Sequence, residues 1–306
     1  MSLRSPKHVA VLATVVCLLS GAAVVTVLES GTFSSSPALY GYGTQPPPPT
    51  ASGVGYRLAT SAGQVIDFGT ATFQGSTETM RLAAPITAMA DTVSHGSLPV
   101  GKGYLLAGAD GGVFAFGDSS FHGSAVGDHP AAPITGIAID PTTGGYWLVD
   151  AIGQVFAFDA RVEQPFHPAA AHEPIVAIAA DPLGTGYWLV GADGSVFGFG
   201  GARSFGSMAG RHLAMPIVGI APTQDGQGYW LVGADGGVFA FGDAPFKGSL
   251  GGRRLSKPIV GIAPTQDARG YWLAGADGGV FSFPDAIFKG STGGSPPSKP
   301  VVAISD

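Results

Sequence analysis

Residues 216–257 read PIVGIAPTQDGQGYWLVGADGGVFAFGDAPFKGSLGGRRLSK, and the next copy begins at residue 258 with PIVGIAPTQDARGYWLAGADGGVFSF. The prolines that open the later copies are 42 residues apart, and the two earlier intervals are 41 and 48 residues; these prolines are Pro85, Pro133, Pro174, Pro216, Pro258 and Pro300. A fixed period in the forties is typical of supersecondary units that stack or that surround an axis. One copy is too small to bury a core alone, so the repeats predict a single domain.

The composition favours tightly turned β-structure. Hydrophobic residues make up 45% of the chain, charged residues only 12%, and 49 of the 306 residues are glycine. Disordered chains are rich in charge and poor in aromatic residues, which this chain is not. The formal net charge of −6 argues against a nucleic-acid partner, which would require a clustered positive surface.

The N-terminal residues predict export. Residues 1–8 contain Arg4 and Lys7, and residues 9–28 form an uncharged apolar run. As a helix this run would be about 30 Å long, the thickness of a bilayer core, with the positive flank in the cytoplasm. We therefore expect a single-pass anchor in the cell membrane, with a Ser-, Gly- and Pro-rich linker over residues 29–53. The alternative is a cleaved signal peptide and a secreted protein.

Each copy is expected to contain four strands. In the copy that starts at Pro216 they are strand A (217–221), strand B (229–232), strand C (238–241) and strand D (246–250). The Ala-Asp-Gly-Gly sequence between strands B and C predicts a hairpin turn, because Asp and Gly tolerate positive φ. Strand B carries a Gly-Tyr-x-Leu marker that occurs six times, starting at Gly55, Gly103, Gly145, Gly186, Gly228 and Gly270.

The strand pattern predicts an all-β, six-bladed β-propeller over residues 54–306. Strands B and C are apolar at every position, so both faces of each sheet must be covered, as they are when sheets pack radially. The first copy lacks strand A, and residues 300–304 form an isolated strand A at the other end of the chain. The C-terminal strand is therefore expected to complete the first four-stranded antiparallel blade and close the ring.

The repeated pattern GYWLVGADGGVFAFGDAPFKGS resembles repeats of exported cell-envelope proteins of actinobacteria. The resemblance covers residues 55–306 and implies a β-propeller, often joined to other domains. It implies little about function. The first copy departs from the pattern with Arg57 at the Trp position, and the third departs at residues 150–153 and 159–161.

No sequence motif indicates a catalytic residue, a metal site or a cofactor. The chain has no nucleophile elbow, zinc-protease motif, phosphate-binding loop or dinucleotide fingerprint. The B–C aspartates are expected to shape their turns rather than to bind calcium; they are Asp110, Asp193, Asp235 and Asp277. His122 and His167 are expected to lie on the surface, and His95 in a long loop.

The loops offer one candidate binding face. Because strands alternate in direction, the B–C and D–A loops share one face of the domain, and the A–B and C–D loops share the other. The D–A loops vary, and those of the fourth and fifth copies carry candidate ligand-binding residues: Arg211, His212, Arg253, Arg254 and Lys257. They are expected near the mouth of the channel and could recognise an anionic polymer or a phospholipid headgroup. A solvated charged rim is the alternative.

The sequence thus predicts a membrane-tethered, extracytoplasmic binding or scaffolding module of the cell envelope. Its expected partners are the membrane, through the N-terminal helix, and an envelope polymer or another protein. Two alternatives stay open: a propeller-type hydrolase or lyase acting on envelope carbohydrate, and a purely structural protein. Enzyme activity would need acidic groups that converge near the axis, and the candidates at the ends of strand A are Asp91, Asp140, Asp181 and Asp306.

Overall fold

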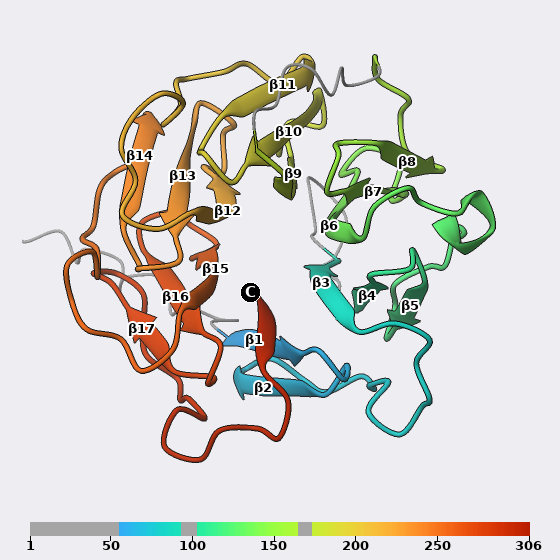
Figure 1. Ribbon diagram of the computed structural model, residues 1–306, viewed down its shortest axis with the longest axis horizontal. Helices are drawn as coiled ribbons and strands as arrows, with labels where there is room; N and C mark the ends of the chain where they lie inside the picture. The colour runs from blue at the N-terminus through green and yellow to red at the C-terminus, as the bar shows by residue number, and fades with distance from the viewer. Residues whose placement is uncertain (1–54, 93–102, 165–172) are drawn as a thin grey trace, which may run out of the picture. The chain divides into compact units, whose positions relative to one another are not determined.

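The described part of the chain is built almost entirely of β-strands. The computed structural model describes residues 55–92, 103–164 and 173–306, which belong to one compact unit. Their strands form six antiparallel sheets of three strands each, arranged around a common centre (Figure 1). The predictions of an all-β fold and of six repeated units are confirmed.

In five sheets the inner, middle and outer strands follow one another along the chain, and in the sixth the inner strand is the last strand of the chain. The first sheets contain β1 (Gly55–Thr60), β2 (Val65–Gly69), β3 (Ile86–Asp91), β4 (Tyr104–Gly108), β5 (Val113–Phe116), β6 (Ile134–Ile139), β7 (Tyr146–Asp150) and β8 (Val155–Phe158). The later ones contain β9 (Ile175–Ala180), β10 (Gly186–Gly191), β11 (Val196–Gly200), β12 (Ile217–Pro222), β13 (Gly228–Gly233), β14 (Val238–Gly242), β15 (Ile259–Pro264), β16 (Tyr271–Gly275), β17 (Val280–Ser282) and β18 (Val301–Ser305). One 3-10 turn, η1 (Ala125–Asp128), follows β5.

The inner strands form a complete circle of contacts. Each contacts the inner strand of the next sheet, in the order β3, β6, β9, β12, β15, β18 and back to β3. The predicted pairing of the last strand with the first strand of the repeat domain is confirmed, because β18 pairs antiparallel with β1. No sheet closes on itself. The circle consists of separate sheets that pack face to face, which is why their middle strands are buried on both sides.

The tryptophans of the repeat fill the spaces between sheets. All four tryptophans are at most 1% exposed. Trp230 packs against Tyr271 of the next sheet with ring centroids 5.6 Å apart, and its indole N–H donates to the carbonyl of Pro245 at 2.9 Å. The tryptophans therefore join neighbouring sheets.

The prediction of four strands per unit is wrong. The segment expected to be strand D, residues 246–250, has no ladder partner. Instead the hydroxyl of Tyr271, on the next sheet, accepts a hydrogen bond from the Lys247 N–H at 3.2 Å and donates one to the Gly248 carbonyl at 2.6 Å. Gly248 has a φ of 123°, outside the range of a strand and unfavourable for other residues. We call this arrangement the tyrosine clasp.

The tyrosine clasp recurs around the circle. Hydroxyl groups of four other tyrosines bind the backbone of the preceding sheet's loop in the same way: Tyr56, Tyr104, Tyr146 and Tyr229. A two-way hydrogen bond to one side chain thus replaces the fourth strand.

The predicted membrane anchor, residues 9–28, and the linker lie outside the described residues, as do His95 and His167. Within the described ranges no helix is long and apolar enough to cross a bilayer.

Candidate functional site

Two places in the molecule carry clusters of charged side chains: the face formed by the loops that lead into the inner strands, and the opposite ends of the inner strands. The B–C turns lie on the first face. Each Asp of the four predicted turns accepts a hydrogen bond from the backbone N–H two residues on, for example Gly237 to Asp235 at 2.9 Å. The predicted turn role of these aspartates is therefore confirmed.

The predicted binding residues are held on this face by a repeated turn. The N–H of Arg211 donates to the Met208 carbonyl and that of Arg253 to the Leu250 carbonyl, and both turns are bonded in turn to the B–C hairpin of their own sheet. Arg211, His212, Arg253, Arg254 and Lys257 are all exposed. Their side chains make no hydrogen bond or ion pair with the described residues, so they are available to a ligand.

The structure extends this set to two more sheets. Lys299 precedes β18 as Lys257 precedes β15, and Arg81 follows its turn as Arg254 does; both are exposed. The corresponding loops of the remaining two sheets carry Asp128 and Glu173 instead. We call the positive set the basic arc: Arg81, Arg211, His212, Arg253, Arg254, Lys257 and Lys299.

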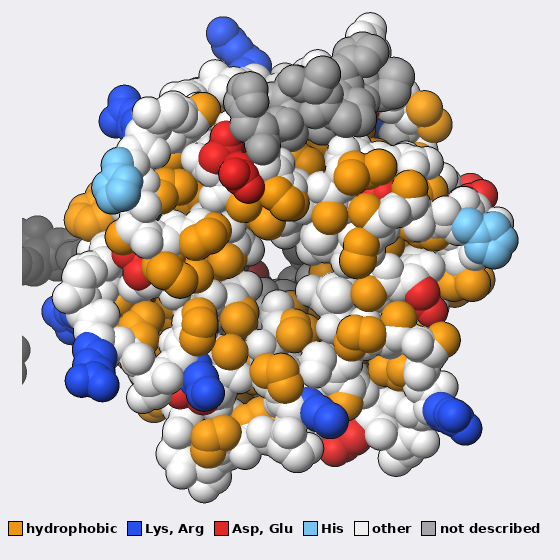
Figure 2. All heavy atoms as spheres, in the orientation of Figure 1, with side chains coloured by type: hydrophobic (Ala, Val, Ile, Leu, Met, Phe, Trp, Pro, Cys, Tyr) orange, Lys and Arg blue, Asp and Glu red, His pale blue; other side chains and the backbone are white. Residues whose placement is uncertain are grey.

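The basic arc surrounds an apolar centre. Figure 2 shows Lys and Arg side chains along the periphery of this face and apolar side chains nearer its middle, around a small opening. Large apolar side chains on these loops are exposed, among them Met80 at 53% and Met215 at 45%. The turns that carry the arginines are bonded to the B–C hairpins of their own sheets.

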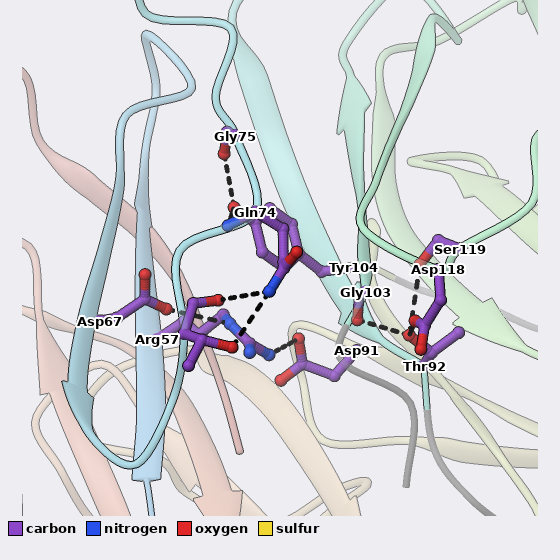
Figure 3. Close-up of polar contacts among 11 residues, drawn as sticks. Arg57, Asp67, Gln74, Gly75, Asp91, Thr92, Gly103, Tyr104, Asp118 and Ser119 are labelled. Carbon is purple, nitrogen blue, oxygen red and sulfur yellow. Dashed lines mark hydrogen bonds and ion pairs between the residues drawn. The ribbon is translucent and has the colours of Figure 1, made fainter. Parts of the chain in front are cut away.

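On the opposite face, Arg57 lies at the centre of a buried ion network. Its Nε is 3.0 Å from Asp67 Oδ1, and its Nη1 is 2.5 Å from Asp91 Oδ1 (Figure 3). Its guanidinium carbon is 4.9 Å from the ring centroid of Tyr104 on the next sheet. Arg57 therefore takes over the contact that tryptophan makes elsewhere, through a cation–π interaction.

Two of the four acidic candidates converge on this network. Asp91 ends β3 and pairs with Tyr104. Ser305 of β18 pairs with Arg57, so Asp306, the next residue, lies at the register of Tyr56, which is the counterpart of Tyr104 in the first copy. Burial raises the pKa of Asp91 to about 6, opposed by Arg57. Burial, and then the charge of Asp91, raises the pKa of Asp306 to about 7. We call Asp91 and Asp306 the axial pair; Figure 1 marks the chain end beside the centre of the ring.

The other two acidic candidates belong to loops. Asp140 and Asp181 lie one residue further along their strands, where the N–H groups of Thr142 and Leu183 donate to them at 2.8 and 3.1 Å. Backbone hydrogen bonds lower the pKa of Asp140 despite its burial. These two carboxylates shape the A–B loops and do not join the axial pair.

A shallow acidic groove lies between the last two A–B loops. Its volume is about 480 Å³, and Asp225, Asp243 and Asp267 line it. Thr223 Oγ1 donates to Asp225 at 3.0 Å and lies 3.1 Å from Asp243, so these oxygens are already engaged. No group of three or more metal-ligating residues is found among the described residues.

His122, expected as a plain surface residue, joins two sheets. Its Nδ1 is 2.7 Å from Asp159 Oδ2 on the next sheet, and its side chain is 21% exposed.

A scan against protein-family models finds no match for the chain, and a search of curated protein sequences finds none either.

Proposed function

We propose that the described residues form a six-bladed β-propeller, in which each three-stranded sheet and the loop that clasps the next sheet make one blade. The circle of inner-strand contacts and the pairing of β18 with β1 support this architecture. The resemblance to exported envelope repeats and the apolar run at residues 9–28 support a propeller held outside the cytoplasm by a membrane anchor.

The propeller acts as a binding module for an anionic envelope polymer. The observation that carries this proposal is the basic arc, whose exposed cations lie on four consecutive sheets and have no carboxylate partner among the described residues. Several basic side chains elsewhere are paired, as Lys247 is with Asp285 at 2.9 Å, although Arg203 and Lys289 make no ion pair with described residues. A row of unpaired cations attracts a polyanion even when the whole chain is acidic.

The position of the basic arc suits a tethered receptor. Gly55, the first described residue, starts β1 at the end of the sheet opposite the B–C hairpin. The described residues therefore begin on the face opposite the basic arc.

The axial pair supports a carbohydrate-cleaving role less well than the basic arc supports polymer binding. Acid–base cleavage needs both carboxyl groups within reach of the substrate. The side chain of Asp91 is only 6% exposed, and its Oδ1 is engaged by Arg57. A polysaccharide would not reach it.

The test measures binding of the full-length chain in detergent to two defined polyanions, inorganic polyphosphate and polygalacturonate. We expect the Arg253→Ala/Arg254→Ala variant to bind about tenfold more weakly, since each exposed charge pair contributes up to about 1 kcal/mol. Binding by the unaltered chain should weaken as salt rises.

Arg269→Ala is the matched control, because Arg269 is an exposed arginine in an A–B loop on the other face. Equal binding by the double variant and the unaltered chain would refute the role of the basic arc.

A further inference from the structure

The interface between the sheets β18-β1-β2 and β3-β4-β5 contains more negative than positive charge. Three carboxyl groups, those of Asp67, Asp91 and Asp306, lie around the single guanidinium of Arg57. A buried charge without a partner is costly, so the carboxyl groups of such a cluster do not all ionise.

Asp91 Oδ2 and Ser305 Oγ are buried from solvent and make no hydrogen bond of good geometry within the described residues. The Ser305 side chain is nevertheless close enough to lower the pKa of Asp91 by hydrogen bonding, against the larger effect of burial. The Asp91 residue is 9% exposed, whereas Asp306 keeps part of its surface exposed. Asp306 is therefore the more accessible member of the axial pair.

We propose that Asp91 and Asp306 share a single proton, and that losing this proton loosens β18, so that closure of the ring depends on pH. Two like-charged carboxylates in one site favour a state with one proton between them. Asp306 directly follows β18, and this strand is bonded in the sheet only to β1. Repulsion between the two carboxylates acts on the strand that joins the two ends of the domain.

The surroundings of the axial pair contain one cation and one further acid. Arg57 on β1 faces both members, and Asp67 on β2 shares that cation. Tyr104 on β4 stays neutral, because burial raises its pKa. The other strands that pack against β18, which are β15 and β16, contribute no charged side chain. No second described cation compensates the pair when it ionises.

The direction of the pH effect follows from proton binding. An aspartate exposed by opening of β18 has an ordinary pKa of about 4, and in the closed ring the pKa values of the pair are raised to about 6 and about 7. Between these limits the closed state binds more protons than the open state, so closure weakens as pH rises. Above about pH 7 no further loss is expected.

Hydrogen–deuterium exchange on the full-length chain tests this inference. After correction for the intrinsic exchange rate, protection of the β18 amides should fall by up to about tenfold between pH 6 and 7, the limit for one linked proton. In Asp306→Asn the fall over this interval should shrink to about twofold, because Asp91 alone is left to titrate and is mostly ionised above pH 6.

Asp267→Asn is the matched control, since Asp267 lies on the same face outside the axial pair; it should behave like the unaltered chain. Protection of β18 that is unchanged by pH, or that falls equally in Asp306→Asn, would overturn the proposal.

A second measurement uses the unaltered chain and does not depend on the folding of a variant. The infrared C=O band of a protonated carboxyl group should be present at pH 6 and absent at pH 9. At pH 6 it should be weaker in Asp306→Asn, where Asp91 alone can hold a proton. A spectrum without this band at pH 6 would show that the axial pair holds no proton.

Discussion

Replacing Tyr271 by phenylalanine removes one oxygen atom that joins two neighbouring sheets. Tyr271 is fully buried, and its ring lies 5.0 Å from the ring of Phe283 and 5.6 Å from that of Trp230. Phenylalanine keeps both contacts and leaves no cavity. The variant therefore isolates the two hydrogen bonds of the tyrosine clasp, to Lys247 N–H and to the Gly248 carbonyl.

The expected loss of stability is about 1–2 kcal/mol. Each hydrogen bond contributes a net 0.5–1.5 kcal/mol or so, and a buried group left without a partner costs more. Lys247 and Gly248 are only partly buried, so water replaces some of the lost interaction and keeps the cost below the upper limit. The free energy of unfolding is measured by urea denaturation, followed by the fluorescence of the four tryptophans.

Two variants of the same loop help to interpret this result. Phe246→Leu changes a side chain that is 61% exposed and should alter stability by less than about 0.5 kcal/mol. Gly248→Ala disturbs the clasp from the other side, because a Cβ at this positive φ would lie 3.0 Å from the Phe283 ring. Since both changes act on one contact, the double variant should lose less than the sum of the single losses. A Tyr271→Phe variant as stable as the unaltered chain would refute the clasp as a joint between sheets.

Two further substitutions test the space between sheets. Trp230→Ala should cost about 3–5 kcal/mol in the same denaturation assay, because it empties a site that is 0% exposed; a loss below 1 kcal/mol would contradict the packing described. Arg57→Trp restores the residue of the other repeats, yet it should destabilise the protein by about 3–5 kcal/mol at pH 8, because Asp67 and Asp91 then lack their cation. Adding Asp67→Ala and Asp91→Ala should recover most of that loss, and a failure to recover it would show that the ion network is not the reason.

The features set by local rules could be predicted from the sequence. The apolar strands B and C, the Asp-Gly turns and the isolated final strand follow from residue patterns within one repeat, and the structure confirms each of them. Strand D could not be predicted in the same way. Its Phe-Lys-Gly sequence resembles a strand end, but its conformation is decided by the hydroxyl of Tyr271, which lies 24 residues away on another sheet.

Pairing register explains what sequence reasoning missed in the sites. Asp91 and Asp140 look equivalent by their place after an inner strand, yet they differ by one residue in register, and only Asp91 reaches the axis. Phe205 takes the place of His122 in its own copy, because the N–H of each donates to a tyrosine hydroxyl on the next sheet: Phe205 to Tyr229 and His122 to Tyr146. Lys299 could have been found from the sequence, because it lies one repeat of 42 residues after Lys257.

The departure of the first copy from the repeat, Arg57 at the tryptophan position, connects the fold to the inferred pH response; the second copy departs at the same position with the apolar Leu105. Four interfaces between sheets are filled by a tryptophan that packs on a tyrosine, for example Trp188 on Tyr229 at 5.7 Å. In the copies with tryptophan a small residue lies opposite it in register, such as Ala240 opposite Trp230, whereas Asp67 lies opposite Arg57. The exchange of an apolar pair for a charged pair occurs where the two ends of the domain meet. A tryptophan opposite a small residue contains no group that titrates, as at Trp230 and Ala240. Under this proposal the charged pair makes closure depend on proton concentration at its interface, while the four tryptophan-filled interfaces stay unaffected.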